Sequence, residues 1–290
     1  MAKAQGTLWV VATPIGNLED LSPRARRVLA EVDRVLCEDT RRTGRLLAAF
    51  GIRAELVSVH EHNESDRVPG LLTLLAEGSS MALVSDAGTP LVSDPGFRLV
   101  QAAAGAGLDV RPVPGPCAAV AALSVAGLPT DRFAFHGFLP PRAAARRAAL
   151  ESVSAGPSTL VFYETGQRLQ AFFEDAAAVL GRDRPAVLAR ELTKLHESVY
   201  RGSLASLAEM AGRDPDVRRG EAVVVVGGAP AQPAEENEAL LRRLLPALLE
   251  ELPPSRAVRL AAKLTGQPRN RVYRLAMSLD GNDPEGPPEA

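Results

Sequence analysis

Short apolar runs alternate with amphipathic segments over the first part of the chain. The runs at 7–12 and 81–85 consist mostly of apolar residues and are each followed by a polar residue, which is typical of buried strands. Segments such as 22–32 and 97–105 instead repeat apolar residues at the spacing of a helix face. Strands that alternate with helices of about ten residues predict a parallel sheet covered on both faces. We therefore predict an α/β domain over residues 1–130.

A second alternating pattern follows. The apolar runs at 133–138, 158–164 and 221–228 predict strands, and the basic stretch at 142–153 has the spacing of an amphipathic helix. We therefore predict a second α/β domain over residues 131–229.

The stretch 235–280 has helical patterns and no strand pattern. It predicts a helix-turn-helix unit in which Ser255 caps one helix, Gly266 ends it and Pro268 opens the next. Residues 253–279 contain six basic residues and no acidic one, which favours contact with nucleic-acid phosphates. The alternative is a small bundle whose exposed arginines have no binding role.

Two features of the sequence interrupt or end the helical pattern of this unit. Pro246 falls inside the first long helical pattern and predicts a kink or a break there. The last residues, 281–290, are rich in Pro, Gly and acid and predict a disordered tail.

Composition narrows the class of protein. The chain has 290 residues, 46% of them hydrophobic, and a formal net charge of −2, which fits two globular domains with an appendage. No apolar run approaches the ~20 residues of a membrane span, so no membrane partner is expected. Cys37 and Cys117 stand outside any metal-ligand spacing. We therefore expect no metal and no disulfide framework, and a cytoplasmic location.

One strand-like run ends in a loop with a repeated Ser-Asp pair, SDAGTPLVSDPG at 85–96. Such loops, at the carboxyl ends of parallel strands, are where α/β sheets bind ligands. Gly88 would let a ligand approach the backbone, and Asp86 or Asp94 would suit a cation or an amine. The loop lacks both the Lys-Ser/Thr of a phosphate loop and the glycine fingerprint of a nicotinamide dehydrogenase. The alternative is a tight turn in which Asp94 and Pro95 start the next helix.

Two other strand ends carry polar residues. The loop ATPIGNLED at 12–20 is expected beside the Ser-Asp loop. In CEDTRRTGR, Glu38 and Asp39 end a strand, and Arg41 and Arg42 begin the next helix. This cluster could hold a general base beside phosphate-binding guanidiniums. The alternative is an exposed helix start with its usual cap and ion pairs.

The segment RELTKLHE at 190–197 follows a later strand and mixes acids, bases and one His. Its spacing is a poor match for a metal site, and no Ser-His-Asp arrangement is visible. A solvated loop is the alternative to a functional one.

Seven strings, in order, resemble one protein family: VATPIGNLEDLSPRA, CEDTRRTGRLL, LVSDAGTPLVSDPG, PVPGPCAAVAAL, FAFHGFLPPR, RELTKLHE and GEAVVVVGG. They resemble the tetrapyrrole-methylase-fold methyltransferases, and within them the branch that methylates a ribose of bacterial 16S rRNA. The likeness runs from about residue 7 to 228, and 254–275 is similar to that branch's helix-turn-helix appendage. It implies a homodimer of chains with two α/β domains and S-adenosylmethionine in the cleft between them.

The resemblance also implies cofactor contacts, which fall on Pro14, Asp86, Ala87, Gly88, Thr89, Pro90, Ser93, Cys117, Ala118, Tyr163 and Leu192. Four of these depart from the family pattern. Thr89 replaces an acid, which leaves Asp86 to substitute for it, and Cys117 takes a hydroxyl position. Tyr163 replaces a methionine, and Leu192 replaces a glycine. We expect the backbone cradle to persist, since any residue supplies its N–H and C=O.

The implied reaction is methyl transfer to the ribose 2'-hydroxyl of a cytidine in the decoding region, on free 16S rRNA or the 30S subunit. Glu38 and Asp39 are the candidate bases, and Lys194 is an alternative that would orient or polarise the hydroxyl. The predicted RNA contacts are Arg41, Arg42, Arg142, Arg146, Arg147, Arg269 and Arg271.

Two other functions stay open. A methyltransferase of the same fold could act on a small molecule such as a tetrapyrrole, although it would not need the basic tail. A non-catalytic RNA-binding protein would use the tail and ignore the cleft, so binding of S-adenosylmethionine separates it from both enzymes.

Overall fold

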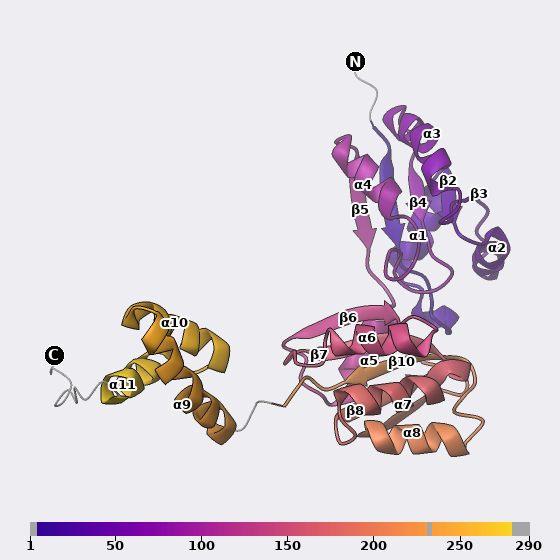
Figure 1. Ribbon diagram of the computed structural model, residues 1–290. Coiled ribbons are helices and arrows are strands. Elements are labelled where there is room, and N and C mark those ends of the chain that lie inside the picture. Colours follow the sequence, from indigo (N-terminus) through magenta and orange to yellow (C-terminus); the bar gives the residue numbers. More distant parts are fainter. Residues whose placement is uncertain (1–4, 231–233, 280–290) are drawn as a thin grey trace. The chain divides into compact units, whose positions relative to one another are not determined.

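The computed structural model describes residues 5–230 and 234–279, and the chain divides into two units, Met1–Ala229 and Pro230–Ala290. The first unit contains two five-stranded sheets with their helices, and the second is helical (Figure 1). The predicted tail at 281–290 lies outside the described residues. Among those that are described, no helix has both the length and the apolar character needed to cross a membrane.

The first sheet is parallel throughout, in the order β3-β2-β4-β1-β5. Its strands are β1 (Thr7–Val11), β2 (Arg34–Cys37), β3 (Glu55–Ser58), β4 (Met81–Leu83) and β5 (Asp109–Val113). Its helices are α1 (Pro23–Glu31), α2 (Thr40–Ala49), α3 (Glu64–Ala76) and α4 (Phe97–Gly105), with a short 3-10 turn, η1, at Leu18–Asp20.

Helices cover both faces of this sheet, as the sequence predicts. On one face, Leu29 of α1 and Leu47 of α2 pack with Val35 of β2. On the other, Leu75 of α3 and Leu99 of α4 pack with Leu36 of the same strand. Neighbouring strand residues thus point to opposite cores, and this burial explains why the strands read as continuous apolar runs.

The second sheet is mixed, in the order β6-β7-β10-β8-β9, and only the β6–β7 pair is parallel. Its strands are β6 (Phe133–Phe138), β7 (Thr159–Thr165), β8 (Pro185–Arg190), β9 (Ser198–Ser203) and β10 (Glu221–Val226). Its helices are α5 (Ala118–Ala126), α6 (Ala143–Glu151), α7 (Leu169–Leu180) and α8 (Leu204–Arg213), with a 3-10 turn, η2, at Gly166–Arg168.

Helix α5 belongs by packing to this second sheet, although it precedes residue 130. Its alanines, such as Ala122, form one core with Val161, Val187 and Val225. Helices α6, α7 and α8 cover the opposite face. The chain therefore passes from one sheet to the other just after β5, earlier than a domain boundary at residue 130.

The helical unit consists of α9 (Ala234–Glu251), α10 (Pro254–Thr265) and α11 (Arg269–Leu279). Gly266 ends α10 with a left-handed φ of 65° and Pro268 immediately precedes α11, as predicted. The predicted cap at Ser255 is wrong, because Pro253 holds the cap position and Ser255 lies in the first turn. A break at Pro246 is also wrong, since α9 continues through it.

Candidate functional site

The loops after β1 and β4 meet at the carboxyl edge of the first sheet. Thr13 and Gly88 exchange backbone hydrogen bonds of 2.9 and 3.1 Å, which form an isolated antiparallel bridge. The Thr13 hydroxyl is buried and donates to the Ser85 carbonyl at 3.2 Å. Gly88 has φ +85°, and a Cβ there would lie 3.3 Å from Cγ2 of Ile15. The close approach expected of these two loops is confirmed.

A cavity of about 340 Å³ opens beside this bridge. Side chains from the loops of both sheets line it, including Glu38 after β2, Asp86 after β4 and Lys194 after β8. Two larger hollows lie elsewhere, one beside α1 and Phe50 and one between α7 and α8. Neither of these two hollows is lined by the Ser-Asp loop at 85–96, so the 340 Å³ cavity is the candidate site.

Most of the predicted cofactor residues line this cavity. Those that do are Asp86, Ala87, Gly88, Thr89, Ser93, Ala118, Tyr163 and Leu192. Pro14, Pro90 and Cys117 are not among its lining residues. Cys117 occupies the N-cap position of α5, and Tyr163 Oη accepts the Ala119 amide at 3.3 Å in the first turn of that helix.

Backbone strain is concentrated in the two loops that form the cavity wall. Every non-glycine residue with positive φ in the described part of the chain lies there: Leu91 (71°), Ser93 (68°), Glu191 (51°) and Thr193 (64°). Such conformations cost energy and persist where the surrounding structure enforces them, often at ligand sites. The strain therefore supports the choice of this cavity.

Asp94 is a site residue for which the sequence leaves two roles open, a ligand for a cation or amine and a helix start. Helix α4 instead begins after Gly96, which has φ 116° and forms no side-chain cap, while Asp94 lines the cavity. Burial, with further contributions from the charges of Glu38 and Asp86, raises the pKa of Asp94 to about 6. The repeated Ser-Asp phrase was the available signal, but Pro95 made its second copy resemble a helix start.

Asp39 has the structural role that the sequence left open. Its carboxylate accepts the backbone amides of Arg41 at 2.8 Å and Arg42 at 3.4 Å, so it caps α2. These hydrogen bonds hold its pKa below the ordinary value, which makes it a weaker base. It does not line the cavity, whereas Glu38 does. Its amide donates to Asp86 at 3.2 Å and thereby helps to position that carboxylate.

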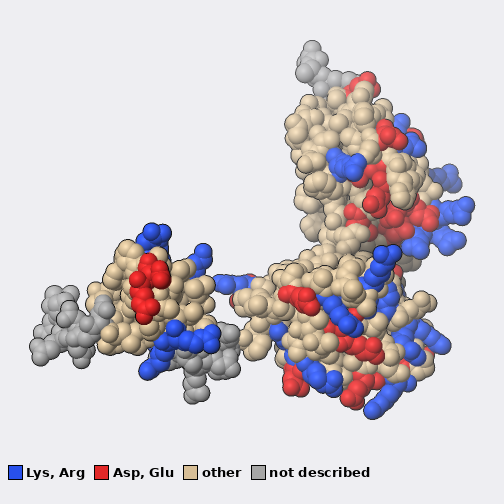
Figure 2. Space-filling view, in the orientation of Figure 1, with Lys and Arg blue, Asp and Glu red and all other residues tan. Residues whose placement is uncertain are grey.

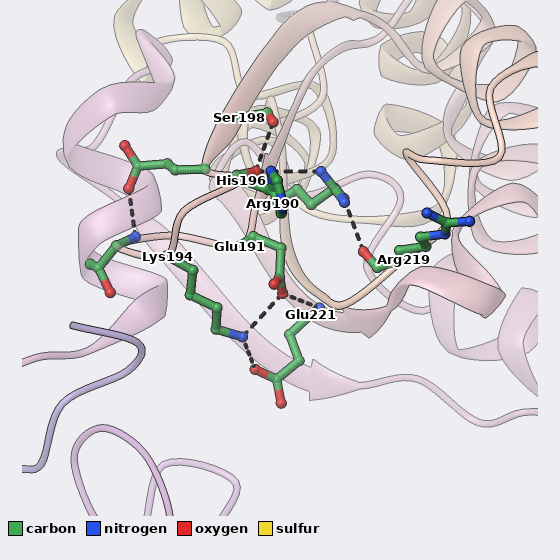
Figure 3. Close-up of polar contacts among 9 residues, drawn as sticks. Arg190, Glu191, Lys194, His196, Ser198, Arg219 and Glu221 are labelled. Carbon is green, nitrogen blue, oxygen red and sulfur yellow. Dashed lines mark hydrogen bonds and ion pairs between the residues drawn. The ribbon is translucent and has the colours of Figure 1, made fainter. Parts of the chain in front are cut away.

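Lys194 lies between two carboxylates at the cavity wall (Figure 3). Its Nζ is 3.0 Å from Oε1 of Glu191 and 2.8 Å from Oε2 of Glu221. Burial lowers the pKa of Lys194, but the hydrogen bonds to Glu221 and Glu191 outweigh it and raise the pKa overall. Lys194 is therefore a fixed ammonium at neutral pH and cannot accept a proton there.

The loop that carries Lys194 is held on both sides. Arg190 is buried, and its guanidinium donates to the carbonyls of Arg219 at 2.9 Å and His196 at 3.4 Å (Figure 3). On the other side, a Cβ at Gly16 would lie 2.4 Å from Cγ of Lys194. The loop at 12–20 can approach this closely only because residue 16 is a glycine.

The predicted RNA-binding arginines fall into different environments. Arg42 lines the cavity and pairs with Asp86 at 3.1 Å, and basic side chains gather over α2 in Figure 2. Arg142, Arg269 and Arg271 are exposed. The prediction for Arg146 is wrong, because this residue is only 4% exposed and its guanidinium pairs with Asp175 at 2.6 Å.

Arg147 shares the same partner but lies at the surface. Its Nε is 2.5 Å from Oδ1 of Asp175, and its side chain is 56% exposed. No three His, Cys, Asp or Glu side chains in the described ranges gather as metal ligands do, and the expectation that no metal is used stays a prediction.

Known proteins match most of the chain. Residues 7–208 match the family model for tetrapyrrole (corrin/porphyrin) methylases, and 234–280 match that for the RsmI C-terminal HTH domain. The chain is 52% identical to the ribosomal RNA small subunit methyltransferase I of Xylella fastidiosa, over 92% of this chain and 98% of the relative. The protein of that name from Pseudomonas aeruginosa is 51% identical, over 95% and 98%.

Solved structures share the two-sheet architecture. A uroporphyrin-III C-methyltransferase from Thermus thermophilus is 26% identical with a TM-score of 0.55, over 78% of this chain and 96% of that one. The methyltransferase CobJ is 21% identical with a TM-score of 0.58, over 79% and 97%, and supports the fold alone.

Proposed function

Because the chain belongs to the tetrapyrrole methylase family, and within it to the ribosomal RNA small subunit methyltransferases I, we propose that it methylates 16S rRNA. The reaction is transfer of a methyl group from S-adenosylmethionine to the 2'-hydroxyl of a cytidine ribose in the decoding region. The observation that carries the proposal is the strained, acid-lined cavity in a chain that matches those relatives almost from end to end.

The residues of the cavity fit the methyl donor. S-adenosylmethionine supplies a methyl group made electrophilic by a positively charged sulfur. A volume of about 340 Å³ lies within the range of small-molecule sites. Gly88 leaves room for a ligand against the backbone, and the carboxylates of Glu38, Asp86 and Asp94 favour a cationic ligand.

A base is needed because a ribose hydroxyl is a poor nucleophile at neutral pH, and a positioned base contributes about 10²–10⁴-fold. Asp94 and Glu38 both line the cavity, whereas the carboxylate of Asp39 caps a helix. With a pKa of about 6, Asp94 is ionised at neutral pH and retains more affinity for a proton than an ordinary aspartate. We assign the proton transfer to Asp94, with Glu38 as the neighbour that helps to raise its pKa.

Lys194 orients the hydroxyl rather than deprotonating it. Its ammonium is fixed by Glu191 and Glu221 and keeps one of its three N–H groups for a ligand. A hydrogen bond from this group to the ribose oxygen would align the hydroxyl and stabilise the negative charge that develops on it.

The helical unit supplies affinity for RNA in this proposal. Arg256, Arg259, Lys263, Arg269, Arg271 and Arg274 are exposed on α10 and α11. Phosphate contacts from such residues add binding that is independent of sequence and weakens with salt. A homodimer working in the cytoplasm belongs to the same proposal, and sedimentation of the purified chain tests the dimer.

The test is methyl transfer from labelled S-adenosylmethionine to 30S subunits that lack the modification, followed by mapping of the labelled nucleotide. We expect one 2'-O-methylcytidine in the decoding region, and free 16S rRNA assayed in parallel identifies the preferred substrate. Transfer to a tetrapyrrole but not to RNA would replace the proposal with the small-molecule alternative. Failure to bind S-adenosylmethionine would leave only an RNA-binding protein.

A further inference from the structure

Strand β6 contains a bulge that changes the direction of one aromatic side chain. Phe135 pairs with Val161, but the next pairs are Gly137 with Phe162 and Phe138 with Tyr163, so β6 has one extra residue. Val161 and Tyr163 lie on the same face of β7. The bulge therefore puts Phe135 and Phe138 on that face together, whereas a regular strand would place residues three apart on opposite faces.

Ring contacts agree with this direction. The Tyr163 ring is 4.9 Å from the ring of Phe135 and 5.7 Å from that of Phe138, both edge to face. The bulge requires a special backbone, since Gly137 has φ +60° and a Cβ there would lie 2.8 Å from Oγ of Ser93. Ser93 itself has positive φ and lines the cavity. The bulge thus packs directly against Ser93 in the loop at 85–96.

The result is an exposed phenyl ring in the cavity wall. Phe138 lines the cavity and is 53% exposed, while Tyr163 beside it is half-buried. The fully buried rings of Phe162 and Phe172 belong to the core on the other face of the sheet. Contact between this apolar ring and water is unfavourable in free energy, and a flat ligand that covered the ring would remove that contact.

We propose that Phe138 stacks on the base of the target nucleotide and holds that base outside the RNA stack while the ribose lies in the cavity. The inference rests on the proposed function, and it assigns recognition of the target base to the cavity wall formed by Phe138. Sequence-specific recognition of RNA usually splays bases out of the stack, and aromatic side chains then stack on those bases and compensate for the lost stacking. Phe138 is more exposed than Tyr163 in the same wall, so its ring is accessible to a large substrate such as RNA.

The test compares F138A with F133A, F138L and F138Y. Phe133 lies at the other end of β6, is 47% exposed and does not line the cavity, so F133A is the matched control. For each variant we would measure the thermal midpoint, the Kd for S-adenosylmethionine by calorimetry, and KM and single-turnover rate with unmodified 30S subunits.

We expect F138A to raise KM for 30S subunits by about 10- to 100-fold, the usual effect of losing one base–aromatic stack. The Kd for S-adenosylmethionine should stay unchanged. F138Y should restore KM because it keeps a flat ring, whereas F138L should not, because it keeps only apolar volume.

If the wild-type chain is active on 30S subunits, three results would overturn the inference. Equal KM values for F138A and F133A would remove the stacking role, and rescue by F138L would show that apolar bulk is sufficient. A raised Kd for S-adenosylmethionine in F138A would show that the ring contacts the cofactor. If the wild-type chain were inactive on 30S subunits, the proposed function would fail first and this inference with it.

Discussion

Two clusters of carboxylates and guanidiniums, in the same unit of the molecule, differ in their balance of charge. The first lies at the cavity and contains Glu38, Asp86, Asp94 and Arg42. The second joins α6 to α7 and contains Arg146, Arg147 and Asp175. In the first, burial and neighbouring acids raise the pKa of Asp94 to about 6. In the second, burial raises the pKa of Asp175, but hydrogen bonds from Arg147 and Arg146 outweigh this effect and lower the pKa overall.

The difference in charge balance distinguishes residues that stabilise the fold from residues that act on a ligand. Asp175 has two cationic partners, so its charge is compensated within the protein. At the cavity Arg42 pairs with Asp86, whereas burial and the neighbouring acids leave the negative charge of Asp94 unfavourable. Unfavourable charge in a cavity is typical of groups whose partner is a ligand. Residue type alone could not make this distinction.

The largest effect is expected for D94N. Removing the proposed base should lower the single-turnover rate with 30S subunits by about 10²–10⁴-fold. The wild-type rate should fall as pH drops through about 6, where Asp94 becomes protonated, and D94N should lack that dependence. The measurement is a pH profile of single turnover for the wild type, D94N and E38Q, with the Kd for S-adenosylmethionine as a control. A full rate in D94N, or an unchanged profile, would return the role to Glu38.

The stability of D94N should change in the opposite direction from its activity. A carboxyl whose folded-state pKa is raised contributes stability below its unfolded pKa of about 4, and this is lost as pH rises through about 6. D94N removes the penalty, so its thermal midpoint should exceed that of the wild type at pH 7 and match it at low pH. A lower midpoint at pH 7 would mean that another contact of Asp94 stabilises the fold.

The second cluster is best broken at its carboxylate. D175A leaves the buried guanidinium of Arg146 without its partner, and such a loss costs about 3 kcal/mol of unfolding free energy. Activity per folded molecule should be retained at low temperature, since neither residue lines the cavity. R147A is the matched control, because its exposed pair with the same aspartate should contribute ~1 kcal/mol or less. Urea denaturation would measure both, and similar losses would contradict the distinction.

The sequence predicted local features better than pairings between distant residues. Gly266 ends α10 because a left-handed residue there needs a glycine, and alternating apolar runs predicted the parallel sheet. The burial of Arg146 depends on Asp175, which is 29 residues away, so no local pattern could reveal it. The packing of α5 on the second sheet and the bulge at Gly137 depend equally on distant partners.

The cavity residues were likewise predictable only where their role does not depend on residues distant in sequence. Most of the cofactor positions came from the family resemblance, and most of those line the cavity. The sequence offered Asp94 as a possible ligand for a cation but not as a base, because its raised pKa depends on burial and on the spatial proximity of Glu38 and Asp86.

A smaller effect is expected from the exposed arginines of the helical unit. The double variant R269A/R271A should weaken binding to 30S subunits and reduce the slope of log affinity against log salt by about 2. The single-turnover rate at saturating 30S should not change, because these residues belong to a different unit from the cavity. R213A, an exposed arginine on α8, is the control. An unchanged salt slope would leave the helical unit without a role in phosphate binding.

The smallest effect is expected at Asp39, which lies beside the cavity cluster but acts as a helix cap. D39N keeps an oxygen that can accept the amides of Arg41 and Arg42 but loses the charge, so it should retain activity with only a slight fall in the thermal midpoint. D39A removes the cap and should lower the midpoint slightly, with the single-turnover rate preserved. Because the folded-state pKa of Asp39 is lowered, its contribution to stability should be present above the unfolded pKa of about 4 and disappear as pH falls through the lower folded value. If D39N instead lost activity with its midpoint nearly unchanged, the charge of Asp39 would matter to the reaction, and Asp39 would be a reactive carboxylate rather than a structural one.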